Sequence, residues 1–251
     1  MMIATLAARE LRSLFLSPLA WTILAVVQFI LAWLFLGQLD VYIAYQAQIA
    51  MMENPPGVTE IIVAPLFSSA TIILLLVIPL LTMRLVSEER RSRTLPLLFS
   101  APLSMSEIVL GKYLGILGFL AIMLGLITLM PLSLMTLGTL DFGLLASNLI
   151  GMVMMLAAFA AAGLFMSTLT AQPTVAAISA FGLLLLLWII QMSGQSAAES
   201  NTVFAYLSLQ RHYEALLRGL FNSSDILYYL LFITTFLVLS IRRLDADRLQ
   251  H

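Results

Sequence analysis

The chain has 251 residues, of which 61% are hydrophobic and only 10% are charged, and its formal net charge is −1 at pH 7. Soluble globular domains carry about 25% charged residues, so this composition leaves no room for a soluble domain of useful size and predicts an all-α integral membrane protein. The sequence contains no Cys, which excludes disulfides, thiolate chemistry and Cys-ligated metals.

The first predicted element is a helix over residues 2–17 that lies along the membrane surface. Its apolar residues recur at helical spacing on one side, with polar residues on the other. It is too polar to span, and an amphipathic helix of this kind lies in the interface with its apolar face down. The alternative is that the segment is the solvated start of the first span. Ser17-Pro18 then marks a bend into the bilayer.

Six apolar segments follow, and a crossing of the hydrocarbon core needs roughly 20 such residues. We predict spans at about residues 19–36, 66–83, 113–137, 145–169, 174–192 and 227–241, with residues 1–251 forming a single transmembrane domain. Residues 38–64 are expected to connect the first two spans, and the tail 244–251 to be too short to fold. The fourth span carries a stripe of small residues that is typical of close helix packing in lipid. The stripe consists of Gly151, Ala157, Ala158, Ala160, Ala161, Ala162 and Gly163.

Residues 203–221 are predicted to form an outer amphipathic helix before the last span. Large apolar residues recur there at helical spacing, and the charged residues between them would lie at mid-membrane if the segment crossed. We therefore expect an interfacial or re-entrant helix. Its His212 is better interpreted as an interface histidine than as a catalyst.

The basic residues are distributed unevenly between the two sides of the membrane. Six spans place both termini, the loop 84–112 and the turn 170–173 on one side. Ten of the twelve Lys and Arg lie on that side, and only Arg211 and Arg218 lie on the other. Positive residues stay cytoplasmic, so both termini are expected in the cytoplasm.

The sequence offers no chemistry of its own. The predicted span cores contain no Asp, Glu, Lys, Arg or His, which ion-coupled carriers usually need. A Walker loop, metal-ligand spacing and a nucleophile with a base are also absent. We expect no catalytic residue, no bound metal and no directly bound cofactor, so energy for any transport must come from another subunit.

The loop 84–112 lies between the second and third spans and is both basic and apolar. Ser104-x-x-Glu107 is a capping-box pattern, which predicts a helix that begins at Met105 and continues into the third span. Thr94 is a second cap candidate, for a short apolar helix that Pro102 would end. Lipid anchoring of a basic loop is the alternative, but exposed apolar side chains favour a groove on a partner protein.

At these residues the sequence resembles the permease subunits of type-2 ABC exporters, most closely their gliding-motility-type branch. The shared pattern over residues 83–112 is M-R-x-x-x-E-E-R-R-S-x-T-L-x-L-L-x-S-A-P-x-S-x-x-E-I-V-L-G-K, and residues 212–219 and 225–229 are similar to the same branch. Two residues depart from the pattern. Arg93 stands where the family usually has Gly, and Pro96 where it usually has an acidic residue.

The resemblance implies a permease in the bacterial inner membrane, driven by a dimer of separate ATPase subunits that bind ATP and Mg. Its loop 90–102 would be a cytoplasmic coupling helix seated in the ATPase. The residues implied in ATPase coupling are Glu88, Glu89, Arg90, Arg91, Thr94, Leu95, Leu97, Leu98, Phe99 and Pro102. Those implied in transmission to the third span are Ser104, Glu107, Gly111 and Lys112, and those of an outer gate helix are His212, Tyr213, Glu214 and Arg218.

The resemblance also implies partners. They are a second permease chain, identical or different, an auxiliary membrane subunit with an extracytoplasmic domain, and membrane lipid, with no nucleic acid. Two other interpretations stay open: a non-transporting membrane scaffold that binds lipid or a soluble regulator through its basic loop, and a permease of the haem-export or copper-maturation type.

Overall fold

The computed structural model describes residues 2–49, 51, 56–95, 103–136, 140–196 and 208–249. Within these ranges the chain is helical and contains no strand, and six helices are long and apolar enough to cross a membrane. The long helices are α2 (Pro18–Ile49), α3 (Ala64–Thr82), α6 (Met105–Ser133), α7 (Phe142–Leu169), α8 (Pro173–Ser196) and α11 (Ser223–Leu249). This confirms the predicted all-α membrane fold.

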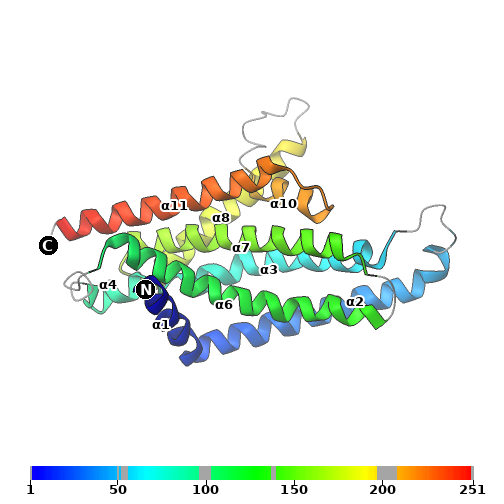
Figure 1. Ribbon diagram of the computed structural model, residues 1–251, viewed down its shortest axis with the longest axis horizontal. Helices are drawn as coiled ribbons and strands as arrows, with labels where there is room; N and C mark the ends of the chain where they lie inside the picture. The colour runs from blue at the N-terminus through cyan, green and yellow to red at the C-terminus, as the bar shows by residue number, and fades with distance from the viewer. Residues whose placement is uncertain are drawn as a thin grey trace.

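The shorter elements are α1 (Met2–Leu16), a π-helical turn η1 (Thr59–Val63), α4 (Ser87–Arg91), a 3-10 turn η2 (Leu134–Thr136) and α10 (Leu209–Leu217). Both chain ends and α4 lie at one end of the bundle, and α10 lies toward the other (Figure 1). We call these the α4 end and the α10 end.

Helix α7 forms the centre of the bundle and packs against α3, α6, α8, α10 and α11. All members of its small-residue stripe are buried, which confirms the predicted packing seam. The closest approach is at Gly163, where an added Cβ would lie 2.2 Å from Thr82 Oγ1 of α3. Only glycine leaves room for the Thr82 side chain this close to the α7 backbone.

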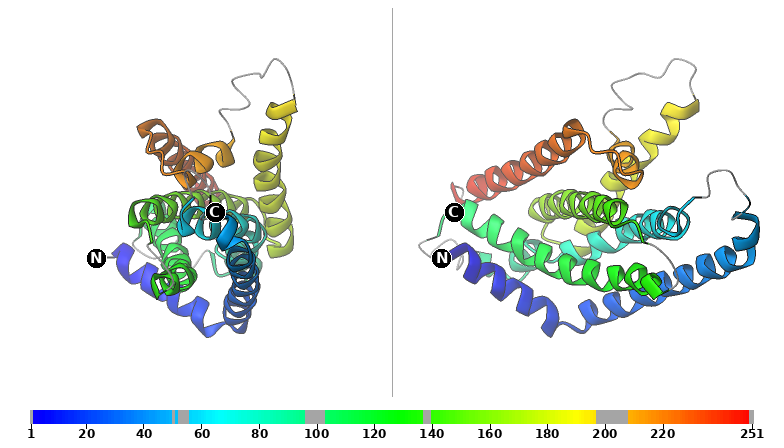
Figure 2. Two further views of the ribbon diagram at one scale, coloured as in Figure 1. Left: turned by 90° about the vertical axis from the view of Figure 1, so that its right-hand side faces the viewer. Right: turned by 45° about the vertical axis from the view of Figure 1, so that its right-hand side comes forward.

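Helix α1 has the predicted amphipathic pattern, and its apolar side contacts protein. It lies against the first half of α6, and a Cβ added at Gly111 would lie 2.6 Å from Leu6 Cβ. A Cβ added at Gly115 would lie 2.6 Å from Glu10 Cβ. The chain turns sharply between α1 and α2, at the predicted Ser17-Pro18 bend (Figure 2).

Two predicted boundaries are wrong. Helix α2 continues to Ile49, well into the expected connection, because residues 38–49 contain no Pro and can extend the helix beyond the apolar part. The tail was expected to be too short to fold, yet α11 continues through it to Leu249. Leu244 is buried in the core there, so tertiary packing supplies the stability that the short segment lacks alone.

Candidate functional site: the anchored α4 segment

The segment α4 begins directly after α3 and has the charge order that a helix favours. Glu88 and Glu89 lie in its first turn and Arg90 and Arg91 in its last, which complements the partial charges of the helix ends. The helix ends at Arg91, and Arg93 two residues later has a φ of 57°, in the left-handed region. The predicted coupling residues Glu88 to Arg91 are therefore helical.

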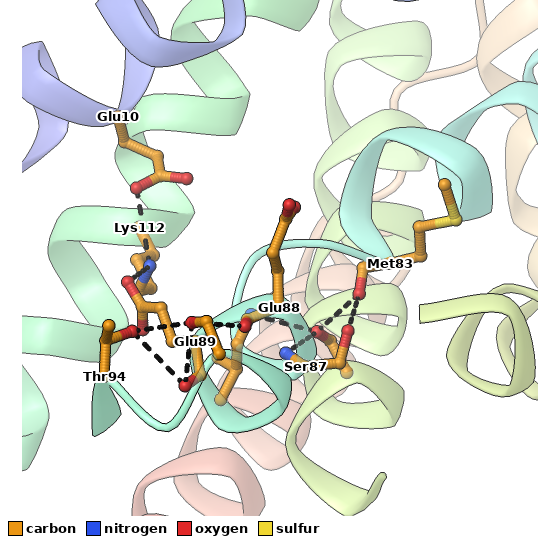
Figure 3. Close-up of polar contacts among 10 residues, drawn as sticks. Glu10, Met83, Ser87, Glu88, Glu89, Thr94 and Lys112 are labelled. Atoms are coloured by element: carbon orange, nitrogen blue, oxygen red, sulfur yellow. Dashed lines mark hydrogen bonds and ion pairs between the residues drawn. The ribbon is translucent and has the colours of Figure 1, made fainter. Parts of the chain in front are cut away.

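Ser167 of α7 fixes the start of α4. Its Oγ accepts hydrogen bonds from the backbone N–H groups of Val86 (3.0 Å) and Ser87 (3.1 Å), and donates to the carbonyl of Met83 (3.0 Å). The Ser87 hydroxyl also donates to the Met83 carbonyl (Figure 3). A buried side chain thus satisfies amide groups that a helix start leaves without intrahelical partners.

Lys112 links α4 to α6 and α1. Its Nζ lies 2.7 Å from Glu89 Oε1 of α4 and 3.4 Å from Glu10 Oε2 of α1 (Figure 3). The Lys112 side chain is only 8% exposed, so its charge is stable there because two carboxylates surround it. The predicted transmission residue Lys112 therefore contacts the predicted coupling residue Glu89.

Arg90 links α4 to α11. Its guanidinium forms an ion pair with Asp247, whose other carboxylate oxygen lies 3.6 Å from Arg243 Nη2 on the same helix. Both side chains of the Arg90–Asp247 pair are less than one quarter exposed. Asp247 lies in the tail that was predicted to be too short to fold.

These side chains form two groups of ion pairs, Glu10–Lys112–Glu89 and Arg90–Asp247–Arg243, which meet at the neighbouring residues Glu89 and Arg90. We call the two groups together the charged cluster. It holds three acids and three bases, so its formal charges balance. Three of its atoms, Glu89 Oε2, Arg90 Nε and Arg243 Nε, are buried and have no hydrogen-bond partner within the described ranges. The cluster is therefore incompletely paired, and each buried atom left without a partner costs free energy.

The predicted capping box at the start of α6 is confirmed. Ser104 Oγ accepts from Glu107 N (3.2 Å), and Glu107 Oε2 accepts from Ser104 N (2.9 Å). The helix from Ser104 to Lys112 is thus continuous with the third span.

The rest of the apolar loop is only partly placed. Leu95 was expected to present its side chain outside, but it is 7% exposed and belongs to the core; an apolar side chain next to the bundle gains by burial there. Thr94 closes the turn after α4, donating from N–H to Glu89 O (3.0 Å). The expected coupling residues Leu97, Leu98, Phe99 and Pro102 lie outside the described residues.

The expected gate residues of α10 lie at the opposite end and do not join the charged cluster (Figure 1). His212 is buried, with Nδ1 2.6 Å from Asp225 Oδ1 of α11 and its ring stacked on Tyr228. Tyr213 is fully buried between α3 and α7, and its hydroxyl donates to Phe67 O (3.3 Å). Burial raises the pKa of Tyr213 above its usual value, so the hydroxyl keeps its proton. Glu214 and Arg218 line an adjoining cavity.

Sequence reasoning missed Glu10, Ser167, Arg243 and Asp247. Glu10 carried a signal, because it recurs with Ile3, Ala7 and Leu14 on the apolar side of α1 at a spacing of three and four residues. Ser167 and Asp247 carried none, since their partners are about 80 and 157 residues away in the chain.

Comparison with known protein families gives one match over almost the whole chain. The sequence model described as "ABC-2 family transporter protein" matches residues 4–249. No curated protein shows significant similarity to the chain.

Proposed function

The chain belongs to the ABC-2 transporter family and is a multi-pass permease subunit of an ABC transporter, and we propose that it couples ATP hydrolysis by a separate ATPase subunit to export. The alternative form of the same proposal is that it transmits motion to an extracytoplasmic partner. We also propose a second permease chain, a dimer of ATPase subunits and, as in the gliding-motility-type branch, an auxiliary membrane subunit.

The observation that carries the proposal is that α4 is tied to four helices at once. Ser167 ties it to α7, Lys112 ties it to α6 and α1, and Asp247 ties it to α11. A short segment with so many anchors can pass a displacement to most of the bundle, because packed helices move as units.

The exposed side of α4 offers the ATPase a charged surface. Glu88 and Arg91 are exposed, while Glu89 and Arg90 turn inward to the cluster. We propose that the ATPase contacts the exposed pair together with the following loop 96–102, and that ATP-driven closure of the ATPase dimer moves α4. The α4 end then faces the cytoplasm, which agrees with its excess of basic residues.

The first test is co-purification. The tagged wild-type chain, extracted in mild detergent from its native host, is expected to recover an ABC ATPase subunit. Leu97→Asp or Leu98→Asp is expected to lose it, because a carboxylate cannot enter an apolar groove without an unpaired buried charge. Leu249→Asp is the control, since Leu249 is 88% exposed at the same end of the bundle, and it should retain the ATPase.

Failure of the wild-type chain to recover any ATPase would overturn the coupling proposal and favour the scaffold interpretation. Retention of the ATPase by both loop variants would instead show that the loop 96–102 is not its contact.

A further inference from the structure

A cavity lies at the α10 end, far from the charged cluster. Its volume is about 1,020 Å³, and it opens between the start of α3, the start of α7 and the end of α10. Clefts that bind small molecules measure roughly 300–1,000 Å³. The cavity is thus large enough for a drug-sized molecule.

Its charged groups come from three different elements and are mostly acidic. Glu60 of η1, Asp141 before α7 and Glu214 of α10 contribute carboxylates, and Arg218 is the only basic residue of the described lining. The formal balance is three negative charges against one positive. This sign opposes anionic ligands and favours a cation.

The carboxylates are spread around the cavity. Among the described residues, no three Asp, Glu or His side chains could hold one metal ion. The lining also includes apolar side chains, among them Leu144, Leu217 and Phe221. A lining that combines carboxylates with apolar side chains suits an organic cation with an apolar body better than a hydrated metal ion.

The walls are held in place by their own hydrogen bonds. Asp141 N donates to Thr59 Oγ1 (2.9 Å), which joins the α7 wall to the η1 wall. Asp141 Oδ1 caps α7 by accepting from Gly143 N (2.8 Å) and Leu144 N (3.1 Å). Ser147 Oγ of α7 donates to Leu216 O of α10 (2.6 Å). The cavity is therefore preformed, which lowers the entropic cost of binding.

We propose that this cavity binds an amphiphilic organic cation. The cationic group lies among Glu60, Asp141 and Glu214, and the apolar part contacts Leu217 and Phe221. Arg218 lies at the same cavity and lowers the affinity for the cation. Binding does not require the ATPase, so it is independent of the coupling proposed above.

The test uses the full-length chain in lipid nanodiscs, with whatever subunits co-purify. The probe is tetraphenylphosphonium, and its control is tetraphenylborate, an anion of nearly the same size and shape. Equilibrium dialysis against the nanodiscs, with protein-free nanodiscs subtracted, should show saturable binding of the phosphonium and none of the borate. Equal saturable binding of both ions, or saturable binding of neither, would overturn the proposal.

Four variants then locate the site. Glu60→Gln and Asp141→Asn should each weaken phosphonium binding about three- to five-fold, the size of effect that exposed charge pairs give. Asn is also a good helix cap, so Asp141→Asn keeps α7 intact. Arg218→Gln should strengthen binding by a similar factor, an effect that general damage to the fold would not produce. Asp40→Asn, an exposed carboxylate of α2 outside the cavity, should bind as the wild type does.

Equal affinities for the wild type and the three cavity variants would place the phosphonium elsewhere and overturn the assignment. A negative result in this assay would leave recovery of the ATPase unchanged. Loss of the ATPase in the co-purification assay would likewise leave phosphonium binding unchanged, so the two proposals fail separately.

Discussion

Arg90 of α4 and Asp247 of α11 form an ion pair across 157 residues of sequence, and this pair fixes α4 to the last helix. Because the two side chains are mostly buried, each charge depends on the other for its stability. The sixth span is therefore joined by this ion pair to the segment between the second and third spans.

Asp247→Asn should lower the free energy of unfolding by about 1–3 kcal/mol, because Arg90 then loses its charged partner. The measurement is thermal or denaturant unfolding of the purified chain in detergent. The charge reversal Arg90→Glu with Asp247→Arg should regain part of the loss. Asp245→Asn is the matched control, because Asp245 is an exposed residue of the same helix. If Asp245→Asn lowers the free energy of unfolding as much as Asp247→Asn does, the tail is merely sensitive to substitution.

Lys112→Met should destabilise the chain by about 3–5 kcal/mol, since two partly buried carboxylates are left without their common cation. Adding Glu10→Gln and Glu89→Gln to this variant removes both uncompensated charges. The triple variant should then unfold at a higher temperature than Lys112→Met alone. If it unfolds at a lower temperature, the electrostatic explanation of the Lys112 site is wrong.

Gly163→Ala should cost about 1–3 kcal/mol or prevent folding, because the new methyl group would overlap Thr82 of α3. Thr82→Ala in the same chain should relieve part of the overlap. Gly182→Ala in α8 has open space around its Cβ and should be tolerated. Comparison of the folded yields by size-exclusion chromatography checks all three, and equal yields for Gly163→Ala and Gly182→Ala would contradict the close approach of α3 and α7.

Arg93→Gly should stabilise the end of α4 by up to about 1 kcal/mol, because the left-handed conformation costs roughly 1–2 kcal/mol for a residue with a Cβ and glycine returns part of this as backbone entropy. Arg93→Val should have the opposite effect, since β-branched residues are strained most there. The measurement is the unfolding midpoint of these two variants and of Arg93→Asn, which loses the charge but tolerates this conformation. The three midpoints rank the variants by stability. A valine variant as stable as the glycine variant would exclude backbone strain at this position.

The backbone conformation of Arg93 illustrates what could and could not be predicted from the sequence. Glycine is expected at this position from the resemblance, and the positive φ supplies the physical reason. Periodicity and apolar length predicted six spans and the amphipathic α1, and the Ser104–Glu107 spacing predicted the start of α6, because these are local properties. The partners of Arg90 and Lys112 depend on how distant helices pack, which no local pattern encodes. For the same reason the folded tail with Asp247 was missed.

The charged cluster also imposes an order on the making of the protein. Glu10 leaves the ribosome 102 residues before Lys112, and Asp247 follows Arg90 by 157 residues. The Glu10 carboxylate of α1 can therefore pair with Lys112 only after α6 has been synthesised. Arg90 of α4 can pair with Asp247 only after the sixth span has been synthesised. A chain interrupted before Asp247 lacks the partner of Arg90, even though all six predicted spans precede that point.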